Sequence, residues 1–101
     1  MSVIQIQKDN FNSEVLQSEK PVLLDFYADW CGPCRMVGPI VSEIANERED
    51  IKVGKINVDE QSELAARFGI MNIPTLVVVK GGEIANFAVG YRSKAQIEAM
   101  L

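Results

Sequence analysis

The fold of this chain can be worked out from one stretch, Ala28-Asp29-Trp30-Cys31-Gly32-Pro33-Cys34-Arg35. It holds both cysteines and the only tryptophan of the chain. The residues before it, Val22 to Ala28, form a short apolar and aromatic run that is typical of a buried strand. In the residues after it, Met36 to Glu49, apolar side chains recur every three or four positions and predict an amphipathic helix: Val37, Ile40, Val41, Ile44 and Ala45. We therefore expect the two thiols at the point where a strand ends and a helix begins.

A helix N-terminus would favour redox chemistry at Cys31. Open α/β sheets place their chemistry at the carboxyl ends of strands, and a helix N-terminus supplies free N–H groups and the positive end of a dipole. These would stabilise the thiolate, which is the reactive form of cysteine. Gly32 lets another backbone approach, and Pro33 sets φ for the first turn. We predict that Cys31 lies at the surface and attacks a disulfide, and that the shielded Cys34 resolves the mixed disulfide.

Two other interpretations of the cysteine pair are weaker. Buried structural thiols rarely occur in a Trp-Cys-Gly-Pro-Cys sequence at a strand end. A zinc site needs about four nitrogen or sulfur ligands. This chain has two cysteines and no histidine, so only a site shared between molecules would bind zinc, and we predict no metal.

The composition fits one globular domain spanning residues 1–101. Fourteen acidic and ten basic residues give a net charge of −4, which offers no basic patch for nucleic acid. No N-terminal apolar run indicates a signal peptide, and no segment is long enough to span a bilayer. We expect a monomer in the cytoplasm, where a closely spaced cysteine pair indicates redox or metal chemistry.

The first half of the chain alternates strands and helices. Alternation predicts a short strand over Val3–Gln7. Asn10 is the expected N-cap of the following helix, which should end before Pro21 because the residue preceding a proline avoids helical angles. Lys52 to Val58 predicts a second central strand, joined to the strand over Val22–Ala28 by a right-handed crossover and parallel to it.

The second half predicts a helix and then a hairpin. Asp59 to Phe68 should form a short helix that Gly69 ends. Leu76–Val79 is strongly strand-like, and Gly81-Gly82 is a two-residue hairpin signal leading into Glu83–Val89. These last two strands must therefore be antiparallel.

The final helix begins at Ser93, and Gln96 three residues later completes a capping box. Together, the predicted elements indicate an α/β sheet with an antiparallel edge.

Asp25 is an unusual residue for the middle of a buried strand. Between apolar neighbours its carboxyl group should be desolvated, which raises its pKa. A buried acid near a redox pair can accept or return a proton as Cys34 changes state. Lys55, inside the neighbouring apolar strand, could pair with it. From the residues alone, it is equally possible that Asp25 and Lys55 both lie on an exposed face of half-buried strands.

The motif from Trp30 to Arg35 resembles the active site of the thioredoxin family, and the resemblance extends along nearly the whole chain. It implies a thioredoxin fold, with a central mixed five-stranded sheet in the order 1-3-2-4-5 and four flanking helices. It also implies functional roles for Asp25 and Lys55, because thioredoxins have an acid and a lysine at the matching places.

The resemblance further implies a substrate-binding surface around Cys31. The bond before Pro74 would be cis and packed against the cysteine pair, and the surrounding apolar surface would be formed by Trp30, Ile73, Pro74, Val89 and Gly90. Some positions depart from the family pattern. Tyr27 stands where a second tryptophan can occur, and Met71-Asn72 replace a basic residue and a glycine beside the substrate loop. Met71 and Asn72 affect which partner proteins, including the reductase, this chain would prefer.

The function implied is that of a protein-disulfide reductase, a thiol–disulfide oxidoreductase that acts as an electron carrier. It would use the redox-active disulfide Cys31-Cys34 without a bound cofactor, act on disulfide-containing proteins and be reduced by a thioredoxin reductase. An oxidant or isomerase is a second hypothesis, but oxidants of this fold usually carry a histidine between the cysteines, where this chain has Gly32-Pro33. A third hypothesis is a binding module within a larger assembly.

Overall fold

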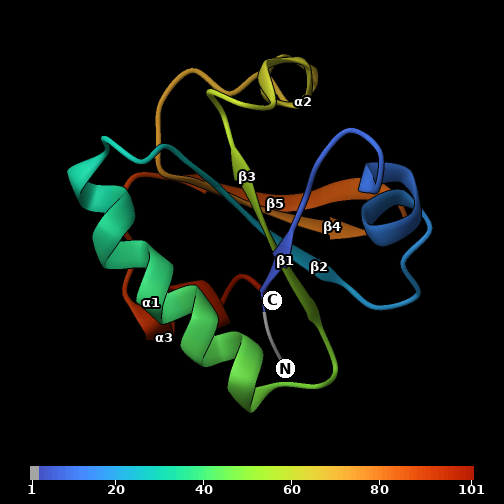
Figure 1. Cartoon of the computed structure of the whole chain (residues 1–101). Helices are drawn as coiled ribbons and strands as arrows, with labels where there is room; N and C mark the ends of the chain where they lie inside the picture. The colour runs from blue at the N-terminus through green and yellow to red at the C-terminus, as the bar shows by residue number, and fades with distance from the viewer. Residues whose placement is uncertain (1–2) are drawn as a thin grey trace.

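The computed structural model describes residues 3–101, whose strands form one five-stranded sheet in the order β1-β3-β2-β4-β5 (Figure 1). This order and the mixed character of the sheet confirm the predicted topology. The strands are β1 (Ile4–Gln5), β2 (Val22–Tyr27), β3 (Lys52–Asn57), β4 (Thr75–Lys80) and β5 (Glu83–Val89). The four helices in the described part of the chain are η1 (Asn12–Leu16), α1 (Gly32–Glu47), α2 (Ser62–Arg67) and α3 (Lys94–Glu98).

The sheet is parallel on one side of β2 and antiparallel on the other. β3 pairs in parallel with both β1 and β2, and the parallel pairing of β2 with β3 is the one expected for strands joined by a crossover helix. β4 runs antiparallel to β2 and to β5. Gly81 and Gly82 form the turn between β4 and β5 with φ angles of 58° and 80°, which glycine adopts without strain. The hairpin predicted from the two glycines is therefore confirmed.

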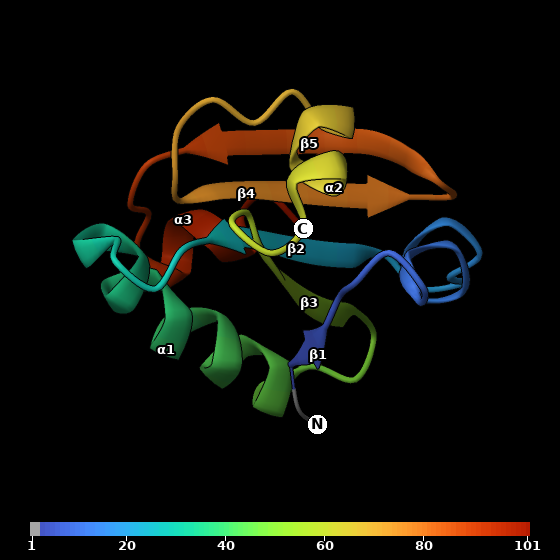
Figure 2. The same ribbon diagram turned by 45° about the horizontal axis from the view of Figure 1, so that its top comes forward.

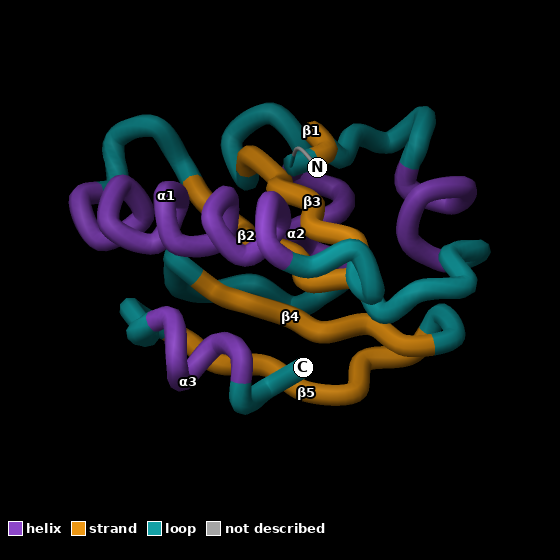
Figure 3. The backbone as a smooth tube through the Cα atoms, turned by 90° about the horizontal axis from the view of Figure 1, so that it is seen from below, coloured by secondary structure: helices purple, strands orange, loops and turns teal. Residues whose placement is uncertain are grey.

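Helices cover both faces of the sheet. Figure 1 shows α1 and α3 on one face and α2 with η1 on the other, and Figure 3 views the molecule from the side of α1 and α3. On the α1 face, the buried core combines residues from three strands and two helices, among them Leu23, Val53, Leu76, Val37, Val41, Ile44 and Ile97. The opposite face has its own core, which includes Phe11, Val15, Leu24, Phe26, Ile56, Leu64 and Val77.

The close approach of Ile6 to β3 requires glycine at position 54. A Cβ atom on Gly54 would lie 2.7 Å from Cγ1 of Ile6 and 3.3 Å from Cδ2 of Leu24. Both of these side chains are fully buried and cannot turn into solvent. We expect Gly54→Ala to lower the free energy of unfolding by about 1–3 kcal/mol, the usual effect of overpacking a core.

Urea unfolding of a double-mutant cycle with Ile6→Ala checks this expectation. Because Ile6→Ala removes the nearest obstacle, Gly54→Ala should cost less in that background than in the native protein. Strictly additive losses would mean that the contact with Ile6 is not the cause.

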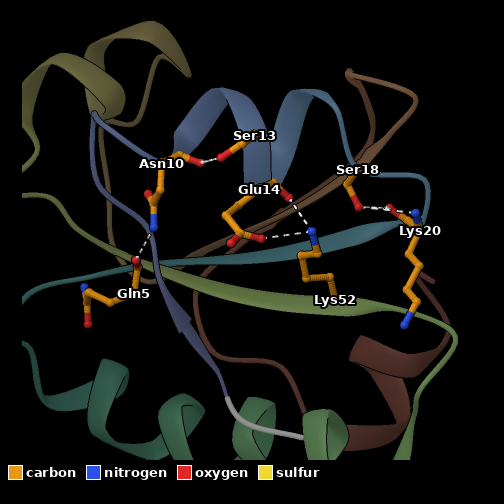
Figure 4. A network of polar contacts seen from close by, with 7 residues as sticks. All are labelled: Gln5, Asn10, Ser13, Glu14, Ser18, Lys20 and Lys52. Carbon is orange, nitrogen blue, oxygen red and sulfur yellow. Dashed lines mark hydrogen bonds and ion pairs between the residues drawn. The ribbon is translucent and has the colours of Figure 1, made fainter.

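The first helix differs from its prediction. Asn10 does not cap it: η1 begins at Asn12, is a π-helix, and has no side-chain capping bond at its N-terminus. The side chain of Asn10 is used in the preceding turn, where Oδ1 accepts from the Gln7 N–H at 2.7 Å and Nδ2 donates to the Gln5 carbonyl at 3.0 Å. Figure 4 shows this bond to Gln5, and also Lys52, whose ammonium group binds Glu14 and ties η1 to β3.

The other helices follow the prediction with shifted ends. α1 begins at Gly32, and α2 covers only Ser62–Arg67 because residues 58–60 form a turn. Gly69, with φ of 65°, follows α2 as expected, and the capping box between Ser93 and Gln96 is confirmed. Within residues 3–101, no helix combines the length and the apolar character that crossing a membrane requires.

Candidate active site

A disulfide joins Cys31 and Cys34 at the start of α1, so the predicted redox-active group is present. Cys31 is the N-cap residue of the helix, and its Sγ accepts the Cys34 N–H at 3.2 Å. The Cys31 N–H donates to the Ala28 carbonyl at 3.2 Å, which fixes the turn from β2 into α1. The sulfur of Cys31 therefore lies among the free N–H groups at the positive end of the helix dipole, where a thiolate is stabilised.

The two cysteines differ less in exposure than the sequence indicated. We expected Cys31 at the surface and Cys34 shielded, but their side chains are 4% and 5% exposed in the disulfide form. The disulfide holds both sulfurs against Ala28, with Tyr27, Val58 and Ile73 packed around them. In this form, burial does not distinguish the two sulfurs, whereas their positions relative to the helix N-terminus do.

Trp30 stands beside the disulfide and is held in place by a residue that the sequence analysis did not identify. The residue is 69% exposed, and its Nε1–H donates to Oδ2 of Asp59 at 2.8 Å. Asp59 is itself oriented by Asn57, whose buried side chain accepts the Asp59 N–H at 2.9 Å. The available signal was Asp59, which directly follows the predicted strand over Lys52–Val58, because parallel strands end at the same edge of the sheet.

The other residues of the predicted substrate surface are connected to the disulfide through Ile73 and Pro74. Ile73 packs against the cysteine pair, and the bond between Ile73 and Pro74 is cis, as the resemblance implied. The Gly90 N–H donates to the Pro74 carbonyl at 2.7 Å, and Val89 pairs with Thr75 across β4 and β5. A hollow of about 140 Å³ separates Trp30 from this region and is lined by Trp30, Val58, Ile70, Met71, Asn72 and Ile73.

Asp25 lies on the face of the sheet that α1 covers. Leu23, two residues earlier on β2, packs with the inner face of α1, so Asp25 points to the same side of the sheet. Its side chain is 2% exposed, and its Oδ1 has no hydrogen-bond partner. Burial raises the pKa of Asp25 to about 7, while the positive charge of Lys55 acts in the opposite direction. The exposed location that remained open from the sequence is therefore excluded for Asp25.

Lys55 is the neighbour of Asp25 in the sheet register but forms no ion pair with it. Its ammonium nitrogen instead lies 5.5 Å from the centre of the Tyr27 ring, a cation–π geometry. The Tyr27 hydroxyl accepts a hydrogen bond from Nε2 of Gln5 at 3.2 Å, which helps to fix the ring. The possible pairing of Lys55 with Asp25 is therefore not an ion pair, although the positive charge of Lys55 still acts on the pKa of Asp25.

The site offers thiol chemistry and a buried acid. Among residues 3–101, no group of three or more histidine, cysteine, aspartate and glutamate side chains could hold a metal ion. Gly32 faces open space, with nothing within 4 Å of the position that a Cβ atom would take. A substrate chain could therefore approach the disulfide from that side.

Comparison with known proteins places the chain in a family. A family model described as Thioredoxin matches residues 2–101. The thioredoxin of Acidithiobacillus ferridurans is 45% identical, with 99% of this chain and 94% of that protein covered. The thioredoxin of Porphyra purpurea is 48% identical, with coverage of 100% and 95%, and Thioredoxin 1 of a Nostoc species is 48% identical, with coverage of 96% and 92%.

These matches agree with the geometry of the site and with the topology of the sheet. The disulfide lies at the junction of β2 and α1, and the surrounding strands have the order expected for this fold. The chain belongs to the thioredoxin family of thiol–disulfide oxidoreductases, and its closely spaced cysteine pair is the group that undergoes dithiol–disulfide exchange.

Proposed function

We propose that this protein is a protein-disulfide reductase in which Cys31 is the attacking thiol and Cys34 the resolving thiol. The observation that carries the assignment is the hydrogen bond from the Cys34 N–H to Sγ of Cys31 at the N-cap of α1. A negative charge on Cys31 gains from this N–H and from the helix dipole. Cys34 lies one turn further on, on the inner side of α1, where a negative charge on its sulfur is stabilised less.

The reaction starts from the reduced protein, with both cysteines as thiols. The Cys31 thiolate attacks one sulfur of the target disulfide, forms a mixed disulfide and releases the other target sulfur as a thiolate. Cys34 then loses its proton and attacks Sγ of Cys31, which closes the Cys31-Cys34 disulfide and releases the second target thiol. The target gains two electrons and two protons, and the protein loses them.

Asp25 is the proposed proton acceptor for Cys34. Its carboxyl group is buried on the side of the sheet that faces α1, and a pKa of about 7 lets it take up or release a proton near neutral pH. Lys55 acts through its charge, which favours the ionised carboxyl group even though the two groups form no ion pair. The ammonium group of Lys55 lies over the Tyr27 ring.

The substrate-binding role is proposed for the residues around the disulfide. Gly32 and Pro33 leave the approach to Cys31 open, since no other part of the protein fills the space beside Gly32. The apolar surface for the target is formed by Trp30, Ile73, Pro74, Val89 and Gly90. Their proximity to the cysteine pair supports the assignment.

Electrons would be resupplied by a thioredoxin reductase, as they are for members of the family. We further propose that the protein acts as a single-domain monomer in the cytoplasm, where a reducing environment keeps a dithiol available. No nucleic acid is proposed as a partner, since the chain carries a net charge of −4.

The emission of Trp30 tests the proposal, because it is the only tryptophan and directly precedes Cys31. Adding dithiothreitol to the oxidised protein should change the emission strongly. A pyridine-nucleotide-linked thioredoxin reductase with its nucleotide should cause the same change, together with nucleotide oxidation. A Cys31→Ser protein should show neither response. If only dithiothreitol acts, the assignment of the reductase is wrong, and if neither acts, the redox role of the pair is wrong.

A further inference from the structure

A second apolar groove lies next to the candidate active site, on the face of the sheet opposite α1. Its volume is about 320 Å³, at the lower end of the range for ligand pockets. One wall is the segment that follows α2, residues 68–72, and the other is β5. Figure 2 shows β5 at the edge of the sheet and the chain leaving α2 alongside it. The floor is formed by Thr75 and Val77, which are buried.

An irregularity in β5 places three large apolar side chains along this groove. Val89 pairs with Thr75 and Phe87 with Val77, so their side chains share a face. Regular alternation would then turn Ile84 to the other face. The register instead shifts between Val78 and Val79, and Ile84 pairs with Val79 on the side of the groove. The strand therefore lines the groove with Ile84, Phe87 and Val89.

These side chains are exposed although the groove is apolar. Phe87 is 63% exposed, Ile84 55% and Met71, on the opposite wall, 90%. None of the residues that line the groove is charged. A contiguous exposed apolar surface of this kind is typical of a binding site. The absence of charged lining residues favours an uncharged, apolar occupant.

The groove is continuous with the candidate active site. Met71 and Asn72 line both the groove and the hollow beside Trp30. At the other wall, Val89 precedes Gly90, which is hydrogen-bonded to Pro74. A target chain that lies in the hollow beside Trp30 therefore reaches one end of the groove.

We propose that the groove binds a bulky apolar side chain of the disulfide-containing target, a few residues from the cysteine that Cys31 attacks. This inference rests on the proposed function and adds a preference among target sequences. Val77, opposite Phe87, lies three residues beyond Pro74, which corresponds to about 10 Å along a strand. An extended target segment bridges that distance in about three residues.

Mixed disulfides between glutathione and a set of synthetic peptides test the preference. Each peptide carries one cysteine in a Ser/Gly background and a single phenylalanine placed two to six residues from it, on either side. The reduced protein becomes oxidised while the peptide and glutathione leave as thiols, and Trp30 emission gives the rate. We expect a roughly tenfold faster reaction for phenylalanine about three residues away than for serine, the factor expected for burying part of one apolar side chain.

The Phe87→Ser and Ile84→Ser proteins should lose most of that preference and retain the native far-ultraviolet circular dichroism spectrum. Asn86→Ala is the matched control: Asn86 is exposed on the same strand and pairs with Val78, on the other face. It should leave the preference unchanged. Reduction of hydroxyethyl disulfide, which is too small to reach the groove, should proceed at the native rate in all three variants.

Other outcomes would overturn the proposal. Equal rates for all peptides, or a preference that survives Phe87→Ser, would show that the groove does not select targets. A dimer in sedimentation that dissociates on Phe87→Ser would assign the groove to a second copy of the chain. Failure of the native protein to reduce hydroxyethyl disulfide would instead contradict the proposed function itself.

Discussion

The Cys34→Ser protein, mixed with a disulfide-bonded target, should accumulate as a covalent adduct through Cys31. The attack does not need Cys34, because the helix N-terminus stabilises the Cys31 thiolate in either case. Release does need it, since the resolving thiol lies one turn away and is connected through the same chain. Replacing this intramolecular step by an encounter with an outside thiol should slow release by roughly 10⁵-fold or more.

The Cys31→Ser protein is the matched control for this experiment. Its remaining thiol lies inside the first turn of α1 and lacks the N-cap position, so it should form few adducts. Mass spectrometry of both mixtures gives the adduct yields directly. The two cysteines are about equally buried in the disulfide form, so the test rests on their positions relative to the helix N-terminus. Equal trapping by the two variants would refute the assignment of attacking and resolving thiols.

The position of the site could be predicted from the sequence because its signals are local. An apolar strand, a Gly-Pro turn and a helical periodicity follow one another within residues 22–49, and they place the cysteines at the junction. The same holds for the capping box at Ser93 and for the turn at Gly81-Gly82. In each case the residues that determine the geometry are neighbours in the chain.

The features that the sequence did not predict depend on contacts between distant segments. Trp30 binds Asp59, and Lys55 lies over Tyr27 instead of pairing with Asp25. Asn10 has the side chain of a helix cap, yet the strand and turn before it take both of its polar atoms. The partner that each of these side chains binds depends on which segments the sheet brings together. Periodicity along a single segment does not contain that information.

The apolar groove along β5 illustrates the same limit. A regular reading of Glu83–Val89 would assign Ile84 and Phe87 to opposite faces of the strand. The shift in register brings them to one face, because Ile84 pairs with Val79 and not with the residue that strict alternation requires. One irregularity in the pairing of β4 with β5 therefore places Ile84 on the same face as Phe87, so that the apolar side chains form a continuous surface next to the active site.

Asp25→Asn should raise the free energy of unfolding, and the gain should grow with pH. Burial raises the pKa of Asp25 from 3.8 to about 7, so the folded protein binds this proton more tightly than the unfolded chain. The native protein therefore loses stability as pH rises between these two values, and the loss levels off above pH 7. Asparagine cannot ionise and does not show this loss. The difference in the free energy of unfolding between the variant and the native protein should be close to zero below pH 4 and reach at most about 4 kcal/mol above pH 7.

The measured gain in the free energy of unfolding should lie below that limit. The buried amide group also leaves polar atoms without hydrogen-bond partners, which costs free energy. Urea unfolding at several pH values gives the curve, and the exposed Asp9 provides the control, since Asp9→Asn should change stability little at any pH. If the free energies of unfolding of the Asp25→Asn and native proteins differed by the same amount at every pH, Asp25 would not be a titrating buried acid.

The same Asp25→Asn protein should reduce disulfides more slowly, because Cys34 would lose its proton acceptor. General acid–base catalysis typically contributes 10²-fold or more, so a decrease of roughly a hundredfold is expected. The deficit should widen as pH approaches 7 from below, since the native carboxyl group becomes an effective base only as it ionises. Rates for adduct formation by Cys34→Ser should not depend on Asp25, because that step uses Cys31 alone. A stability gain without any change in the rate of release would leave Asp25 with a structural role, and the proton would then have to leave Cys34 directly to water.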